Sequence, residues 1–351
     1  MTMDFVNKIM NVAFPPAGLL FLSFIAPPYY FSKYICSVFR RFTSENVRGK
    51  VVLVTGASSG IGEQISYQYA KMGASLALVA RREQSLNEVA DRARQLGSPD
   101  VLAIPADVSR ADECKRFVDE TVDHFGRLDH LVNNAGILCI SMFEEATDIT
   151  TLSPVMDINF WGAIYPTYHA LPHLKRSRGK IVVTASSGSI LNLPRMSLYN
   201  ASKAALVSFY ETLRIEVSPE IKITIATPAM IESEITKGKF LDRSGKMRVE
   251  QDARDVEVGP VPVAYAEDCA KAIVCGACRG KRCVTVPSWF RVFFLYRLLL
   301  PEFVEWCYRV FYIKRASSSR SHLVSKVVLD TTGAKKVLFP ESIQKDEVKT
   351  D

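Results

Sequence analysis

The stretch Thr55-Gly56-Ala57-Ser58-Ser59-Gly60-Ile61-Gly62 decides how this 351-residue chain folds. It comes directly after the apolar run Val51–Thr55 and opens a helical pattern. Glycines spaced G-x3-G-x-G allow a tight turn, a close approach of backbone to a pyrophosphate, and close packing of a helix whose N-terminus faces the anion. A plain turn also uses glycines, but this position between strand and helix favours a dinucleotide-binding loop. The residues predicted to contact the dinucleotide here are Gly56, Ser58, Ser59, Gly60, Ile61 and Gly62.

Outward from this loop, short apolar runs alternate with helical patterns from Lys50 to about Val286, which is typical of βαβ units around a parallel sheet. The expected strands are Val51–Thr55, Ser75–Ala80, Val101–Pro105, Asp129–Val132, Lys180–Ala185, Lys222–Ala226 and Cys283–Val286. The longest helices are expected near Leu152–Arg176 and Leu198–Val217. The pattern predicts an α/β fold, a Rossmann-type doubly wound parallel sheet of seven strands with helices on both faces.

The composition limits the possible partners. The formal net charge is +7, but no basic stripe interleaved with stacking aromatics occurs in the main domain, so we expect no nucleic-acid binding. Eight cysteines in a chain of this length do not make a disulfide scaffold. Cys275 and Cys278 form a CxxC, but no histidine lies in this stretch, so we expect reduced cysteines on a helix and no metal site.

The choice of dinucleotide depends on the end of the second strand. A carboxylate there binds the ribose 2′-hydroxyl of NAD, whereas an arginine accommodates the 2′-phosphate of NADP. This chain has Ala80-Arg81-Arg82. Arg81 and Arg82 therefore predict NADP(H) as the cofactor; the alternative is that both are solvated side chains at the start of a helix.

A Tyr–Lys pair supplies the predicted chemistry. Tyr199 and Lys203 are spaced i and i+4, on one face of a helix. A phenol has a pKa of about 10, and a neighbouring ammonium together with an oxidised nicotinamide favours the phenolate and lowers that pKa. Ser186, at the end of the fifth strand, is placed to hold a carbonyl or alkoxide oxygen. Its neighbour Ser187 is the less favoured candidate, because Ser186 has the better spacing to Tyr199.

Together these motifs resemble the short-chain dehydrogenase/reductase family over about Lys50 to Val286. The motifs that carry the resemblance are TGASSGIG, Asp107 after the third strand, Asn133-Asn134-Ala135-Gly136 after the fourth, Ser186, and the Tyr199/Lys203 pair. The resemblance implies that Asp107 binds the adenine ring, that Asn134, Ala135 and Gly136 lie along the cofactor, and that Asn159 completes a catalytic tetrad through a water relay. Val108, Lys203, Ile231 and Ser233 are expected to contact the cofactor as well.

Two positions depart from the family pattern. The family usually has Pro-Gly after the sixth strand, and this chain has Pro228-Ala229, whose extra methyl group lies near the expected nicotinamide site. Ser59 stands where NADP users of the family often have a basic residue, so binding of the 2′-phosphate rests on Arg81 and Arg82.

A narrower resemblance rests on further stretches. Pro15 and Pro27 flank an apolar segment, Gly126–Gly136 reads GRLDHLVNNAG, and Asp157–Gly162 and Pro287–Phe290 follow. The whole is similar to the plant steroleosins, which are 11β-hydroxysteroid dehydrogenase-like proteins of seed oil bodies with a proline-bearing anchor. That resemblance implies NADP(H) and a sterol or brassinosteroid-like substrate.

The N-terminal segment predicts attachment to lipid. No charge lies between Lys8 and Lys33, and Val12–Phe31 is almost entirely apolar. Two proline pairs, Pro15-Pro16 and Pro27-Pro28, argue against one straight span and favour a monotopic hairpin or a half-inserted anchor. A cleaved signal peptide fits less well, because the basic leading region and the small-residue cleavage site are missing. Basic residues after the run place the following domain in the cytosol, on a lipid droplet (oil body) or the endoplasmic reticulum membrane.

The expected organisation is an anchor over 1–40, the NADP-binding domain over 45–287, an amphipathic extension over 288–313 and a largely disordered tail over 314–351. The extension is rich in aromatics and arginine, and either lies in a lipid interface or packs on the main domain. The irregular stretch Met230–Val263 is expected to form a lid over the substrate. The family commonly forms dimers through its two long central helices, which implies a homodimer.

We therefore expect an enzyme in which Tyr199 transfers the hydroxyl proton of a hydrophobic secondary alcohol, Ser186 holds the oxygen, and both contact the substrate. Two alternatives remain at this stage. One is a lipid-droplet coat or sterol-binding protein without turnover, which the intact Ser186, Tyr199 and Lys203 disfavour. The other is a reductase of retinoid or other lipid carbonyls, with the same chemistry and a different pocket.

Overall fold

The structure is a computed structural model that describes residues 2–42, 44–313 and 323–344. It divides the chain into two compact units, Met1–Glu45 and Asn46–Asp351. The first unit is one helix and the second holds the sheet and the remaining elements.

The N-terminal unit is a single helix, α1 (Thr2–Phe42), with all four prolines inside it. Of the two predicted forms of anchor, the hairpin is therefore wrong, because no turn occurs at either proline pair, and the half-inserted anchor stays a prediction. Each proline removes one backbone donor, but the apolar residues on both sides continue the helical ladder, so the loss stays local. Its stretch Met3–Cys36 is long and apolar enough to cross a membrane by length and composition. At 1.5 Å per residue, α1 is about 60 Å long, twice the roughly 30 Å of a bilayer core.

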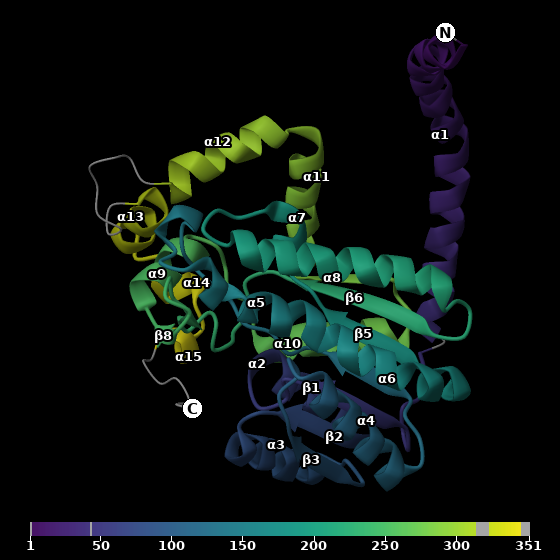
Figure 1. Ribbon diagram of the computed structural model, residues 1–351, viewed down its shortest axis with the longest axis vertical. Helices are drawn as coiled ribbons and strands as arrows, with labels where there is room; N and C mark the ends of the chain where they lie inside the picture. Colours follow the sequence, from purple (N-terminus) through teal and green to yellow (C-terminus); the bar gives the residue numbers. More distant parts are fainter. Residues whose placement is uncertain (1, 43, 314–322, 345–351) are drawn as a thin grey trace. The chain divides into compact units, whose positions relative to one another are not determined.

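The second unit is built on a seven-stranded, fully parallel sheet with the order β3-β2-β1-β4-β5-β6-β9 (Figure 1). The strands are β1 (Val51–Thr55), β2 (Ser75–Ala80), β3 (Val101–Pro105), β4 (His130–Asn133), β5 (Lys180–Thr184), β6 (Lys222–Pro228) and β9 (Cys283–Val286). The order reverses between β1 and β4, which is the switch point where doubly wound sheets bind ligands. The predicted fold class is confirmed.

Helices cover both faces of the sheet. One core joins the sheet to α2 (Gly60–Lys71), α3 (Glu83–Gln95) and α10 (Ala266–Cys278). The other joins it to α4 (Ala111–Phe125), α6 (Gly162–Ser177) and α8 (Ser197–Glu216). Because both faces are covered, β1 and β5 are buried along their whole length, which explains their continuous apolar runs.

Several predicted boundaries need correction. The fourth strand begins at His130 rather than Asp129, because the Asp129 carboxylate accepts a hydrogen bond from the Val51 amide (2.9 Å) ahead of the strand. The fifth strand ends at Thr184, and the sixth extends to Pro228. The long helix predicted at Leu152–Arg176 is not continuous. It comprises the last residue of η2 (Ile149–Leu152), the short helix α5 (Pro154–Met156), a π-helical turn η3 (Asp157–Trp161), and then α6, and one more short helix, η1 (Phe143–Glu145), precedes it.

The segment after β6 contains structure of its own. It forms an antiparallel pair, β7 (Lys239–Leu241) and β8 (Met247–Val249), and the helix α9 (Gln251–Val258). The Leu241 amide donates to the Leu138 carbonyl (2.8 Å), so this segment is attached to the loop that follows β4. A short helix, α7 (Gly188–Leu191), follows β5.

The C-terminal segment corrects the prediction of disorder over 314–351. Residues 314–322 and 345–351 lie outside the described residues, but three helices occupy the segment between them: α13 (Val324–Thr331), α14 (Lys335–Leu338) and α15 (Glu341–Gln344). Several of their apolar side chains fall at the contact points. Leu329, Phe339 and Ile343 are buried against Val258 and Val263.

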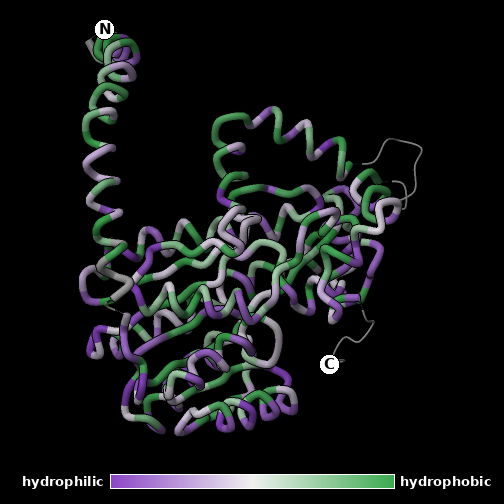
Figure 2. The backbone as a smooth tube through the Cα atoms, turned by 180° about the vertical axis from the view of Figure 1, so that it is seen from behind, coloured by the Kyte–Doolittle hydropathy of each residue, from purple (hydrophilic) through white to green (hydrophobic). Residues whose placement is uncertain are grey.

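The extension forms η4 (Ser288–Phe290), α11 (Arg291–Leu299) and α12 (Pro301–Tyr312). Its two ends contact the domain through Phe290 and Tyr312, which are buried. Between them the apolar side chains remain exposed, as in Leu298 (75%) and Trp306 (59%). Figure 2 shows that hydrophobic stretches, broken by short hydrophilic ones, run along these helices. The sequence left two alternatives for the extension, a lipid interface or packing on the main domain. Packing on the domain explains only the two ends of the extension.

Candidate functional site

The glycine loop forms a closely packed turn between β1 and α2. Gly56 has a φ of +65°, and a Cβ added there would lie 2.7 Å from the Ala135 Cα. A Cβ on Gly62 would lie 2.2 Å from the Gly56 carbonyl oxygen. The Asn134 Nδ2 donates to the carbonyls of Thr55 (3.2 Å) and Gly56 (3.3 Å), so the turns after β1 and β4 are held together. The start of α2, at Gly60 and Ile61, therefore lines a cavity, and a helix N-terminus is where a pyrophosphate binds in such folds.

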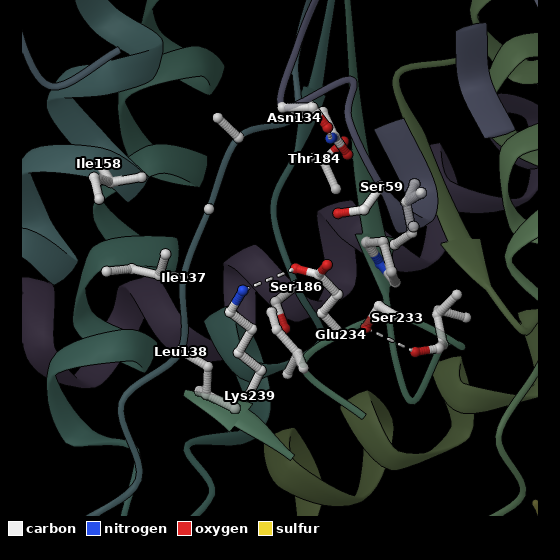
Figure 3. Close-up of a pocket in the computed structure, with 18 of the residues that line it drawn as sticks. Ser59, Asn134, Ile137, Leu138, Ile158, Thr184, Ser186, Ser233, Glu234 and Lys239 are labelled. Atoms are coloured by element: carbon white, nitrogen blue, oxygen red, sulfur yellow. Dashed lines mark hydrogen bonds and ion pairs between the residues drawn. The ribbon is translucent and has the colours of Figure 1, made fainter. Parts of the chain in front are cut away.

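A cavity of about 290 Å³ lies at the carboxyl ends of the strands (Figure 3). We call its first side the loop wall, which comprises Gly56, Ser58, Ser59, Gly60, Ile61, Arg81, Arg82, Asp107, Val108, Asn134, Ala135 and Gly136. We call its second side the apolar wall, which comprises Ile137, Leu138, Ile158, Leu193, Met196, Met230, Ile235 and Met247. The remaining predicted residues that line the cavity are Ser186, Tyr199, Lys203, Ile231 and Ser233. Gly62 and Asn159 are the two predicted site residues that lie behind the lining.

Ser186 and Tyr199 meet in this cavity. Ser186 follows β5, and its Oγ accepts a hydrogen bond from the Gly188 amide (3.1 Å), which fixes the side chain. The Ser186 hydroxyl also forms a hydrogen bond with the Tyr199 hydroxyl. Ser187 is buried, and its amide donates to the Pro228 carbonyl (2.8 Å). The hydroxyls of Ser186 and Tyr199 therefore lie together at the cavity.

Lys203 lies on the same face of α8 as Tyr199. Its ammonium is 5.9 Å from the centre of the Tyr199 ring and donates to the Thr184 carbonyl (3.1 Å). The side chain is almost fully buried, and burial lowers the pKa of Lys203 to about 8. This lysine therefore loses its proton more readily than an exposed lysine does.

Burial acts on the pKa of Tyr199 as well. In the protein alone, burial raises the pKa of the phenol above its ordinary value, and the hydrogen bond with Ser186 opposes this. Of these two opposed effects, desolvation of the phenolate is the larger. The lowering of the pKa by the Lys203 ammonium together with an oxidised nicotinamide concerns the cofactor-bound protein and stays a prediction.

Asn159 occupies the π-helical turn η3, a distortion that often occurs at functional sites. Its Oδ1 accepts from the Ile137 amide (2.8 Å), and its Nδ2 donates to the Ile137 carbonyl (2.9 Å) and the Ser202 hydroxyl (3.0 Å). A Cβ on Gly136 would lie 3.2 Å from both Asn159 Oδ1 and Lys203 Nζ. Asn159 therefore ties the segment after β4 to the helix that carries Tyr199.

Asp107 and Ala229 take the places that their positions in the sequence imply. The Asp107 Oδ1 accepts from the Ser109 amide (2.9 Å) and hydroxyl (2.7 Å), which fixes the carboxylate at the edge of the cavity. Ala229 lines the cavity and donates its amide to the Val286 carbonyl (2.8 Å). Among the described residues, the non-glycine residues with positive φ are Arg178, Asn192 and Arg195. Alanine at position 229 therefore adopts its backbone conformation without strain.

The two arginines after β2 differ. Arg81 is exposed at the edge of the cavity. Arg82 is held by the Ser59 hydroxyl (2.9 Å), the Ser58 hydroxyl (3.3 Å) and the Glu234 carboxylate (2.6 Å). Ser59, which stands where a basic residue is usual, therefore fixes Arg82 in place.

Sequence reasoning missed most of the apolar wall and Glu234. Leu193 and Met196 lie in the turn before α8, while Ile235 and Met247 come from the segment after β6. None belongs to a motif or a periodic pattern. Only their general location, in the predicted lid and beside the catalytic helix, was open to sequence analysis.

Comparison with known proteins identifies the class. Residues 50–244 match the family model described as short chain dehydrogenase, and the chain belongs to this family. It is 55% identical over 349 residues to the 11-beta-hydroxysteroid dehydrogenase A of Arachis hypogaea, a match that covers 99% of this chain and 100% of the relative. It is 53% identical, over the same shares, to the 11-beta-hydroxysteroid dehydrogenase 1A of Arabidopsis thaliana. The protein is thus a hydroxysteroid dehydrogenase-like oxidoreductase of the short-chain type.

Solved structures share the fold. A short-chain dehydrogenase/reductase from Burkholderia phymatum in complex with NAD has a TM-score of 0.65 at 24% identity, covering 74% of this chain and 96% of that one. An alcohol dehydrogenase from Thermococcus sibiricus, complexed with 5-hydroxy-NADP, has a TM-score of 0.54 at 27% identity, covering 65% and 90%.

Proposed function

We propose that the protein interconverts a hydroxyl and a ketone on a hydrophobic, sterol-type substrate with NADP(H), at a lipid surface. The observation that carries this proposal is the meeting of Ser186, Tyr199 and Lys203 in a cavity with a glycine loop on one side and an apolar wall on the other.

The loop wall fits a dinucleotide. A side chain at Gly56 or Gly62 would fill the space against the backbone, and Arg81 and Arg82 stand where a 2′-phosphate is recognised in related folds. The residues proposed to hold the cofactor are Gly56, Ser58, Ser59, Gly60, Ile61, Gly62, Arg81, Arg82, Asp107, Val108, Asn134, Ala135, Gly136, Lys203, Ile231 and Ser233. When bound, the nicotinamide exchanges a hydride with the carbon that bears the oxygen.

The remaining steps belong to the protein's own side chains. The Tyr199 hydroxyl gives or takes the proton of the substrate oxygen, and the Ser186 hydroxyl donates a hydrogen bond to that oxygen. Lys203, whose pKa is about 8, is buried on the same face of α8 as Tyr199, and its ammonium favours the Tyr199 phenolate. Asn159 acts as a positioning residue, because its contacts fix the backbone of Ile137 and the Ser202 turn of α8.

The apolar wall supports a hydrophobic substrate. Leu138, Met196 and Ile235 belong to one cluster that includes the Tyr199 ring. The hydroxyls of Tyr199 and Ser186 therefore lie beside an apolar surface. The sterol class is supported by the printed names of the plant relatives, which are hydroxysteroid dehydrogenases. Two exposed apolar features, α1 and the α11–α12 extension, support action at a lipid droplet or endoplasmic reticulum membrane.

We also propose a homodimer formed through α6 and α8. Both helices carry large apolar side chains on their exposed faces, including Tyr168 (70% exposed) on α6 and Ile215 (79% exposed) on α8. Burial of such side chains against a second copy is the arrangement that the family implies.

Turnover by the full-length protein in detergent tests this function. NADP⁺ or NAD⁺ is offered with sterols, retinols and fatty alcohols, and reduction of the cofactor is followed by absorbance. Sterol oxidation with NADP⁺ is expected, and Tyr199→Phe is expected to lower kcat by about a thousandfold, since general acid–base catalysis contributes 10²–10⁴-fold.

Ser189→Ala is a suitable control, because it removes a hydroxyl that is absent from the cavity lining. The Ser189 hydroxyl donates a hydrogen bond to the backbone carbonyl of Ser186 and not to its side chain. NADPH binding without turnover of any alcohol would instead indicate a coat or sterol-binding protein. Turnover of retinols and not sterols would indicate a retinoid reductase.

A further inference from the structure

The side chain of Glu234 lies between two cations at the edge of the cavity. One carboxylate oxygen is 2.6 Å from the Arg82 guanidinium, and the other is 3.8 Å from the Lys239 ammonium. Figure 3 shows the contact between Glu234 and Lys239 across the segment that follows β6. The three side chains are 11–20% exposed, so water screens their charges only partly.

Arg82 is one of the two arginines on which recognition of a 2′-phosphate depends in the proposed function. One nitrogen of its guanidinium donates hydrogen bonds to the Ser58 and Ser59 hydroxyls, and another donates to the Glu234 carboxylate. A phosphate that binds this guanidinium brings negative charge next to the Glu234 carboxylate, and like charges at such a distance repel.

From this geometry we propose that Glu234 competes with the 2′-phosphate of the dinucleotide for Arg82, and so determines how strongly the site prefers NADP(H) over NAD(H). NAD lacks this phosphate, so its binding leaves the Arg82–Glu234 pair in place. NADP draws Arg82 away from Glu234, and the carboxylate keeps Lys239 as its partner. The proposal rests on the proposed dinucleotide function but makes no use of the substrate.

The position of Lys239 links this exchange to the apolar wall. Lys239 is the first residue of β7, and β7 continues into Leu241, whose amide donates to the Leu138 carbonyl (2.8 Å). A stronger contact between Glu234 and Lys239 therefore holds β7 against the cavity. Binding of NADP⁺ orders the 234–250 segment, whereas NAD⁺ has little effect on it.

Direct binding of both dinucleotides to the full-length protein tests the proposal. Kd values for NADP⁺ and NAD⁺ are measured by calorimetry for the wild type and Glu234→Gln, which removes the charge and keeps the shape. Loss of the competing ion pair is expected to lower the Kd for NADP⁺ about tenfold, the equivalent of one partly buried ion pair. The Kd for NAD⁺ is expected to change less than about twofold.

Glu267→Gln is the matched control, because Glu267 is a nearby surface carboxylate that pairs with Lys71 and not with Arg82. It is expected to leave both Kd values unchanged. Hydrogen exchange over 234–250 adds a second readout: NADP⁺ is expected to protect this segment in the wild type and to protect it less in Glu234→Gln.

Two results would overturn the proposal. An unchanged Kd for NADP⁺ in Glu234→Gln would show that the carboxylate does not compete. Weaker binding of NAD⁺ would show that Glu234 instead accepts a ribose hydroxyl. Failure of the wild type to bind either dinucleotide would contradict the proposed function itself, and is thereby distinguished from both.

Discussion

The loop wall and the apolar wall of the cavity are built in different ways. The loop wall consists of turns that directly follow β1, β2, β3 and β4, and backbone contacts hold these turns to one another, as between Asn134 and Gly56. The apolar wall collects side chains from separate segments, including Leu193 before α8 and Met247 in β8. A wall made of backbone tolerates few sequences, whereas a wall made of apolar side chains tolerates many. This explains why one side of the cavity carries motifs and the other does not.

The two walls also differ in what supports them from behind. The loop wall rests on the sheet, but part of the apolar wall rests on the C-terminal helices. Met230, which lines the cavity, packs in the cluster of Val258, Val263 and Leu329. The Val263 amide donates to the Leu338 carbonyl (2.9 Å), and Lys335 pairs with Asp255 of α9 (3.0 Å). The C-terminal segment therefore supports the apolar wall of the cavity.

The largest effect is expected from Gly62→Ala, which tests the loop wall. The added Cβ would lie 2.2 Å from the Gly56 carbonyl oxygen and 2.4 Å from Asn134 Nδ2, so the glycine loop must shift. Overpacking of this kind costs about 1–3 kcal/mol, and we expect NADP⁺ binding to weaken by up to about a hundredfold. Gly18→Ala is the control, because a Cβ there meets nothing within 4 Å. Unchanged NADP⁺ binding in Gly62→Ala would remove the glycine loop from the cofactor site.

A smaller effect, confined to the other wall, is expected from Leu329→Ala. Leu329 is fully buried behind Met230, and a Leu→Ala change in a core costs about 2–5 kcal/mol. We expect a lower midpoint of thermal unfolding and a KM for the alcohol raised about fivefold, with the Kd for NADP⁺ unchanged, since the cavity formed lies behind the apolar wall alone. Val337→Ala, at an 86% exposed position of the same segment, is expected to have neither effect. A higher Kd for NADP⁺ in Leu329→Ala than in the wild type would show that the two walls are not independent.

The difference between the walls explains what could be predicted from the sequence. The fold and the loop wall followed from Gly56, Asn134 and the strand pattern, because these features are local. The C-terminal helices were mistaken for disorder, since a few residues such as Leu329 and Phe339 meet partners distant in the sequence and leave no periodic signal. The role of Glu234 was missed for the same reason: its partner Arg82 is 152 positions away.

Lys203 stands where the two walls meet, and the pH dependence of stability tests how deeply it is buried. Burial lowers its pKa from 10.5 to about 8, so between these values the unfolded chain binds more protons than the folded protein. Stability therefore rises with pH in this window, by at most about 1.4 kcal/mol per pH unit from this group, and is insensitive to it below about pH 8. The free energy of unfolding is measured with denaturant from about pH 7 to about pH 10 for the wild type and for Lys203→Met, which removes the charge. Groups that titrate in both proteins cancel in the difference between the two. A difference that grows in favour of the wild type above about pH 8 is expected. If the difference in unfolding free energy does not change with pH, solvent reaches the Lys203 ammonium and the lysine is not buried between the two walls.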